Sequence, residues 1–99
     1  MSGSPESLGP IFFALSDPLR RRVLEAAIAH DGATVTQLCE LFPVSRFAVM
    51  RHLNTLEETG LIRREVKGRE RRVYSTGFKF EEAIAAWARQ IRERSVCDE

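Results

Sequence analysis

The chain has 99 residues, a length that fits one domain with one hydrophobic core of modest size. Hydrophobic residues make up 43% and charged residues 29%, which argues against wholesale disorder, and no apolar run approaches the roughly 20 residues that cross a bilayer. The net charge of the chain is only +1, but the segment from Ser45 to Ser75 contains eight basic and four acidic residues. That segment therefore has a net charge of +4.

Apolar spacing predicts two helices at the start of the chain. The first carries Leu8, Ile11, Phe12 and Leu15 at helical intervals and ends before Pro18. Asp17 and Pro18 then form a helix-start signal, since aspartate accepts from the first amides and proline needs no amide partner there. The second helix extends to about His30. In its triplet Arg20-Arg21-Arg22, one arginine can reach a phosphate while another pairs with Glu25 or another acidic residue.

The next segment predicts a helix, a tight turn and a second helix. Thr36 can cap a short third helix, which Pro43 stops because proline disfavours helical geometry in the residue before it. Ser45 caps a fourth helix that Gly60 closes. Its inward-facing residues are Val49, Leu53 and Leu56. The connection between these two helices, Phe42-Pro43-Val44, has a length that is typical of DNA-binding helix-turn-helix units.

After Gly60, β-forming residues on both sides of Lys67-Gly68-Arg69-Glu70 predict a two-stranded hairpin. A last helix from about Phe78 to Arg94 carries an apolar stripe: Phe80, Ala83, Ile84, Trp87, Ala88 and Ile91. The predicted fold is mainly α with a small β-hairpin, a winged helix-turn-helix of five helices with the hairpin before the last. We expect one domain over residues 5–95 and flexible ends at 1–4 and 96–99.

The outward positions of the fourth helix are candidates for contacts in a DNA major groove: Arg46, Phe47, Met50, Arg51 and Asn54. Arginine can pair with guanine, asparagine with adenine, and an apolar side chain with a thymine methyl. Ser45 and the helix N-terminus suit a phosphate, and His52 either packs or contacts phosphate. Lys67, Arg69, Arg71 and Arg72 in the hairpin suit the DNA backbone or minor groove. The alternative is that these cations are merely solvated.

Two long stretches, FFALSDPLRRRVLE and TVTQLCELFPVSRFAVMRHLNTLEETGLIRREVKGRERRVYS, resemble the ArsR/SmtB family of bacterial winged-helix regulators. The resemblance covers nearly all of residues 10–76, and its most specific parts are ALSDPLRRRVL, SRFAVMRHLNTLEETGLI and RRVYS. It implies a homodimer built from the first and last helices, with two recognition helices in successive major grooves of an inverted-repeat operator. Such regulators usually repress until a ligand or redox event releases the DNA.

The family's sensing sites are not recognisable in this chain. Thr34-Val35-Thr36 stands where metalloid sensors have two cysteines, and hydroxyls are poor ligands for soft metals. Cys39 is expected to pack as a small hydrophobe, and the last helix has no histidine for a zinc or nickel site. His30 and His52 lack companions at ligand spacing. We therefore expect no metal and no cofactor, and the effector stays open.

Dimer contacts are expected from the first and last helices, at Leu8, Ile11, Phe12, Leu15, Phe80, Ile84, Trp87 and Ile91. The start MSGSPESLG lacks the basic segment of a secretory signal, and Cys39 and Cys97 do not form a disulfide framework, so we expect a cytoplasmic protein without membrane contact. Without a phosphate loop, nucleophile elbow or metal cluster, the chain is not expected to be an enzyme. The alternatives are a metal-responsive regulator, for example to nickel, with an unrecognised site, or an interaction module that no longer binds DNA.

Overall fold

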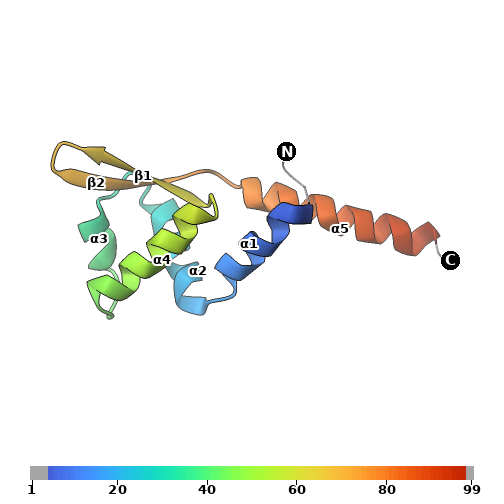
Figure 1. The fold of residues 1–99 in the computed structure, drawn as a ribbon, viewed down its shortest axis with the longest axis horizontal. Coiled ribbons are helices and arrows are strands. Elements are labelled where there is room, and N and C mark those ends of the chain that lie inside the picture. The colour runs from blue at the N-terminus through green and yellow to red at the C-terminus, as the bar shows by residue number, and fades with distance from the viewer. Residues whose placement is uncertain (1–4, 98–99) are drawn as a thin grey trace.

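A computed structural model describes residues 5–97 and shows seven elements in the predicted order (Figure 1). The elements are α1 (Pro5–Leu15), α2 (Pro18–Ala29), α3 (Val35–Cys39), α4 (Arg46–Glu58), β1 (Ile62–Lys67), β2 (Glu70–Ser75) and α5 (Lys79–Cys97). This order confirms the predicted winged helix-turn-helix. Of the ends expected to be flexible, 1–4 and 96–99, residues 1–4 and 98–99 lie outside the described residues, and residues 96–97 belong to α5.

Side-chain caps start α2, α3 and α4, and one of them differs from the expectation. Asp17 accepts from the Arg20 amide at 3.0 Å with Pro18 in the first turn, and Ser45 accepts from the Ala48 amide at 3.1 Å, as predicted. The predicted cap Thr36 is wrong. Thr34 caps α3 instead, because Gln37 stands three residues later and their side chains accept from each other's amides at 3.0 and 2.9 Å.

The hairpin is pinned to the segment that precedes α3. β1 and β2 pair antiparallel from Ile62 opposite Ser75 to Lys67 opposite Glu70, and Gly68 begins the two-residue turn with a φ of 63°. The Val73 amide donates to the Ala33 carbonyl at 2.8 Å, which ties β2 to that segment. The hairpin, here called the wing, is therefore held beside α3 and α4.

The main core lies between α2, α3, α4 and the wing. The three predicted inward residues of α4 are fully buried, which confirms that face of the helix. Val23, Leu38 and Val73 are equally buried and come from α2, α3 and β2. A continuous apolar interior therefore fixes α4 by one face and leaves its opposite face to solvent.

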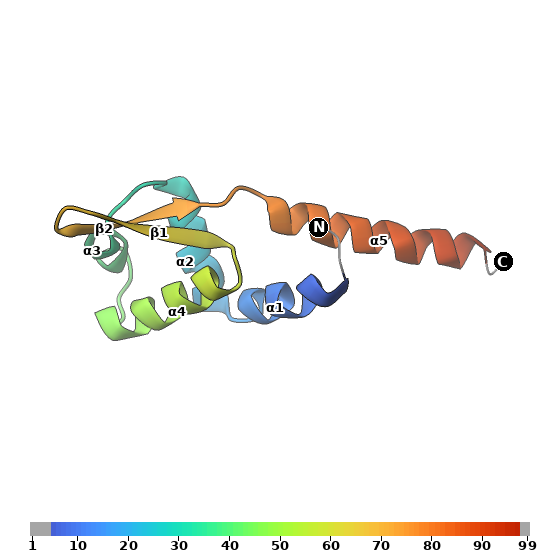
Figure 2. The same ribbon diagram turned by 45° about the horizontal axis from the view of Figure 1, so that its top comes forward.

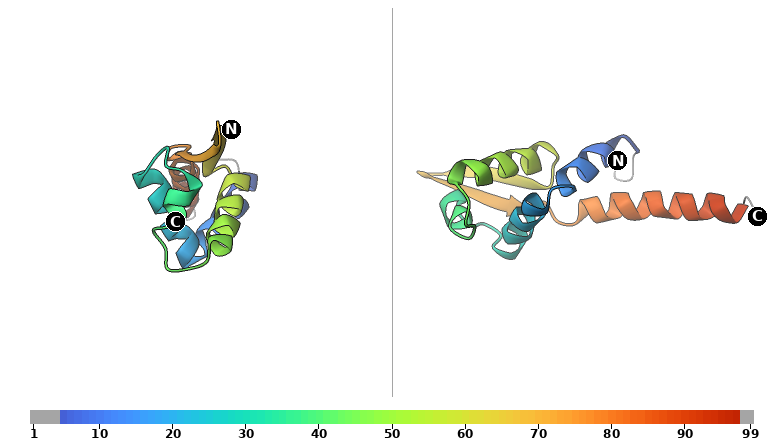
Figure 3. Two further views of the ribbon diagram at one scale, coloured as in Figure 1. Left: turned by 90° about the vertical axis from the view of Figure 1, so that its left-hand side faces the viewer. Right: turned by 90° about the horizontal axis from the view of Figure 1, so that it is seen from below.

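The last helix extends away from this core, and the molecule measures 57 × 26 × 20 Å. α1 lies beside the first half of α5, and the far end of α5 and the wing tip are at opposite ends of the molecule (Figures 2 and 3). Leu8 and Ile11 pack with Ala83 in a second small cluster. Residues 89–95 are all exposed. Within residues 5–97, no helix has the length and apolarity that crossing a membrane requires.

Candidate nucleic-acid interface

The outer face of α4 presents most of the side chains proposed for the major groove. Arg46, Phe47, Arg51 and Asn54 are exposed, and Phe47 is 73% exposed, which is unusual for an aromatic residue on a structural helix. Met50 differs from them, because it is half-buried and packs partly against the main core. The helix thus offers two cations, an amide and one large apolar group to a partner.

A contact with the wing holds Asn54 on this face. Arg64 of β1 donates from Nη2 to the Asn54 Oδ1 at 2.8 Å and to the Glu57 Oε1 at 2.6 Å. The Arg64 hydrogen bond lowers the pKa of Glu57, so this carboxylate is charged at neutral pH. Arg64 lies 10 residues from Asn54 on another element. No spacing rule within a helix could have assigned it this positioning role.

The four wing cations that the sequence predicts to contact DNA fall into two groups. Lys67, Arg69 and Arg71 are exposed around the turn. Arg72 is half-buried and donates to the Gly32 carbonyl and to the Glu70 carboxylate, both at 2.8 Å. The structure therefore gives Arg72 internal partners that brace the wing. Lys67 lies 4.0 Å from the Glu65 carboxylate and 5.2 Å from the centre of the Tyr74 ring, whereas Arg69 and Arg71 extend from the wing.

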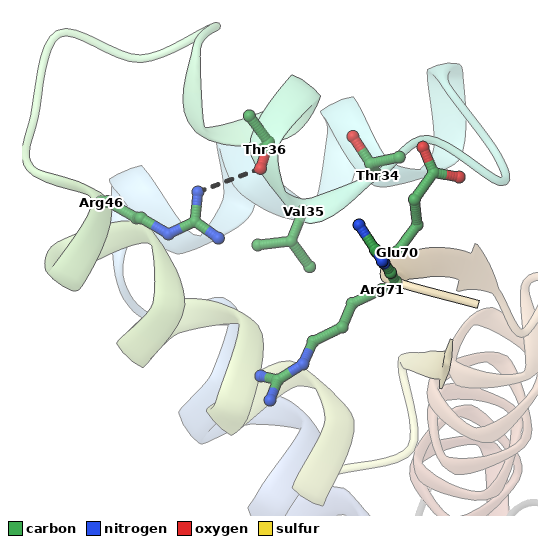
Figure 4. Close-up of a pocket in the computed structure, with 7 residues that line it drawn as sticks. Thr34, Val35, Thr36, Arg46, Glu70 and Arg71 are labelled. Carbon is green, nitrogen blue, oxygen red and sulfur yellow. Dashed lines mark hydrogen bonds between the residues drawn. The ribbon is translucent and has the colours of Figure 1, made fainter. Parts of the chain in front are cut away.

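A hollow of about 400 Å³ lies between α3, the start of α4 and the wing (Figure 4). It is lined by Thr34, Val35, Thr36, Arg46, Arg69, Glu70 and Arg71. Arg46 donates to the Thr36 hydroxyl at 3.2 Å, so its guanidinium faces α3. The structure thus brings residues of both expected DNA-contacting elements to one concave surface.

His52 of α4 is half-buried, and its side chain contacts an arginine that supports the helix. Arg20 of α2 is only 9% exposed and donates from Nε to the His52 Nδ1 at 3.4 Å and from Nη1 to the Phe13 carbonyl at 3.3 Å. Its guanidinium also lies 5.2 Å from the centre of the Phe13 ring. Arg21 donates to the Leu15 carbonyl at 2.6 Å. These arginines therefore connect α2 to α1 and α4, a role that the run of three did not reveal.

The expected dimer residues also divide into two groups. Leu8 and Ile11 are buried within the chain, and Leu15, Phe80 and Ile84 pack against them. Phe12, Trp87 and Ile91 stay 42%, 39% and 42% exposed. The Phe12 and Trp87 rings meet edge to face with centroids 5.8 Å apart, which joins α1 and α5 into one exposed apolar surface.

Metal-ligating residues do not gather in the part of the chain that the structure describes. No group of three or more histidine, cysteine or acidic side chains is placed to hold an ion between residues 5 and 97. Cys39 is half-buried against the core, and burial raises the pKa of its thiol. The thiol is therefore protonated at neutral pH, the form that binds metals poorly. The side chain of Cys97 lies outside the described residues.

Comparison with known proteins decides the family. A helix-turn-helix domain model matches residues 15–65. A crystallised ArsR family transcriptional regulator is 36% identical over 94% of both chains, with a TM-score of 0.76. This chain belongs to the ArsR family. This ArsR family member thus has the family and fold of DNA-binding transcription regulators, which are not enzymes.

Two further structures extend the comparison. An ArsR-like transcriptional regulator from Rhodococcus sp. RHA1 is 30% identical, with a TM-score of 0.73 over 95% of this chain and 94% of that regulator. FabT of Streptococcus pneumoniae, crystallised in complex with DNA, shares the fold at 16% identity and a TM-score of 0.59, over 83% of this chain and 60% of FabT. No curated protein sequence matches the chain.

Proposed function

We propose that this ArsR family protein is a homodimeric repressor that binds an inverted-repeat operator through α4 and the wing. The observation that carries the proposal is the pairing of the exposed outer face of α4 with the basic wing tip at one end of the molecule (Figure 1). A helix fits the major groove, and cations beside it suit the phosphate backbone. A partner protein would instead favour an apolar centre with few charges.

Base reading is assigned to the exposed middle of α4. Arg51 and Asn54 offer hydrogen bonds to base edges, and Phe47 offers an apolar surface for a thymine methyl. Met50 and His52 contribute less directly, since both are half-buried and help to hold the helix. Ser45 caps the N-terminus of α4, the end of the helix that would enter the major groove.

Backbone contacts are assigned to the three exposed cations at the tip of the wing, Lys67, Arg69 and Arg71. Arg72 supports these contacts indirectly, because its hydrogen bond to the Gly32 carbonyl holds β2 against the segment before α3. These contacts add affinity on any sequence and fix the position of α4 on the duplex.

The homodimer is supported by the exposed apolar surface of Phe12, Trp87 and Ile91. Aromatic side chains of this kind commonly anchor protein interfaces, and a two-fold arrangement would let each α5 cover the other. Two α4 helices related by that symmetry should enter half-sites about 10 base pairs apart or a multiple of that distance.

Selection of bound fragments from genomic DNA, followed by footprinting, tests this function. The expected result is a short inverted repeat protected on one face of the duplex. Arg51→Ala should lose the selected site, whereas the control Arg92→Ala on α5, exposed and far from α4, should retain it. Selection that returns no shared sequence, or a protein that retains no DNA, would exclude the proposal.

A further inference from the structure

The hollow between α3, α4 and the wing has the composition of an anion site. Three of its seven lining residues are arginines, Arg46, Arg69 and Arg71, and one is an acid, Glu70. The acid is already engaged, because Arg72 donates to the Glu70 Oε1 at 2.8 Å. The remaining charge facing the hollow is therefore strongly positive.

Two of the arginines approach the hollow from different elements. Figure 4 shows Arg46 from α4 and Arg71 from β2 extending toward the same space beside Val35, while the Glu70 carboxylate turns away from it. Like charges that converge repel each other unless an anion lies between them. The planar fork of each guanidinium can give two parallel hydrogen bonds to one anion.

Hydroxyl groups add neutral donors on the α3 side. The Thr36 oxygen accepts a hydrogen bond from the Arg46 Nη1 at 3.2 Å, which leaves the hydrogen of that hydroxyl to be donated elsewhere. The Thr34 oxygen accepts in the same way from the Gln37 amide at 3.0 Å. Both threonines line the hollow, so its wall offers hydroxyl donors beside the guanidinium groups.

We propose that this hollow binds one tetrahedral oxyanion of the phosphate type, held between Arg46 and Arg71 with the Thr36 hydroxyl as a further donor. Forks arriving from two directions suit an ion whose oxygens point to the corners of a tetrahedron better than a planar carboxylate. Arg46 then grips phosphate instead of reading a base edge. The oxyanion is either a backbone phosphate of DNA or a free phosphate.

The first test uses inorganic phosphate and the DNA-free protein, so it does not depend on the proposed regulatory function. Phosphate replaces chloride at constant ionic strength while the amide signals of residues 34–36, 46 and 69–71 are followed by NMR. The expected result is a saturating shift confined to these amides. Arg46→Gln and Arg71→Gln should each weaken binding by about tenfold or more, because each removes charge-assisted hydrogen bonds.

Arg92→Gln on α5 is the matched control, since Arg92 is an exposed arginine far from the hollow, and it should bind phosphate as the unaltered chain does. Thermal unfolding of each variant shows that the fold is retained. Shifts that do not saturate, that chloride reproduces, or that persist with equal affinity in Arg46→Gln and Arg71→Gln would overturn the proposal.

The second test separates the two sources of the oxyanion and alone rests on the proposed function. DNA affinity is measured with phosphate or chloride at matched ionic strength. If a backbone phosphate occupies the hollow, phosphate should weaken DNA binding more than chloride does, and Arg71→Gln should abolish that difference. If the hollow takes a free anion that DNA leaves in place, the two salts should act alike while the phosphate-dependent NMR shifts remain.

Discussion

Replacing Trp87 by alanine is expected to weaken a dimer formed through α1 and α5 by roughly three to four orders of magnitude. The residue is 39% exposed, and a whole tryptophan side chain presents about 250 Å², so about 100 Å² awaits a partner. Burying that area contributes about 2.5 kcal/mol in one protomer at about 25 cal/mol per Å². A two-fold interface loses the contribution twice, about 5 kcal/mol, and about 1.4 kcal/mol corresponds to each tenfold change.

Sedimentation velocity over a dilution series measures the change, with circular dichroism to show that the fold is retained. The main core lies in α2, α3, α4 and the wing, so the loss of Trp87 should leave each protomer folded. Trp87→Glu should be monomeric at all concentrations tested. The control Phe47→Ala removes an exposed aromatic residue from α4 and should leave the dimer intact. An unchanged dimer in Trp87→Glu would refute the assignment of the interface to this surface.

Three further predictions concern α4, the wing and the core. Arg51→Ala should cost about 1–3 kcal/mol of binding free energy on the selected operator and much less on random DNA. Arg69→Ala should weaken binding to both DNAs alike and lower the slope of log affinity against log salt by about 1. Titrations of both DNAs at several salt concentrations separate the two variants, and identical behaviour would contradict the division of roles. The hydrogen bond from Arg64 lowers the pKa of Glu57, so the pair adds to the free energy of unfolding. That contribution is complete above the usual pKa of 4.5 and is lost as pH falls through the pKa of the folded state. Urea unfolding at pH 7 and pH 3 should show that Glu57→Gln removes this part of the acid sensitivity, at most about 1 kcal/mol because the carboxylate is partly exposed; an unchanged pH dependence would count against the pair. In a Cys97→Ser chain, Cys39 should react with a disulfide reagent more slowly when folded than in urea, because burial shields its sulfur and raises the pKa of its thiol. Equal rates would be inconsistent with that burial.

Local signals in the sequence were enough for the architecture. Asp17, Ser45 and Gly60 mark helix ends through groups within three residues of each cap or through a φ that glycine readily adopts, and all three act as predicted. The inward residues of α4 follow from helical periodicity alone. The one misplaced cap, Thr36 for Thr34, arose because both are threonines, and only the reciprocal partner Gln37 distinguishes them.

The functional surface depended on contacts between distant parts of the chain, and these are what only the tertiary structure decided. Arg72 differs from Arg71 because it reaches the Gly32 carbonyl 40 residues away, a distance in sequence that no turn or helix rule spans. His52 supports α4 because Arg20 is buried beneath it, 32 residues earlier. Periodicity placed these residues on their elements, but side chains of one type acquire different roles only when packing determines which carbonyl, ring or carboxylate lies within reach.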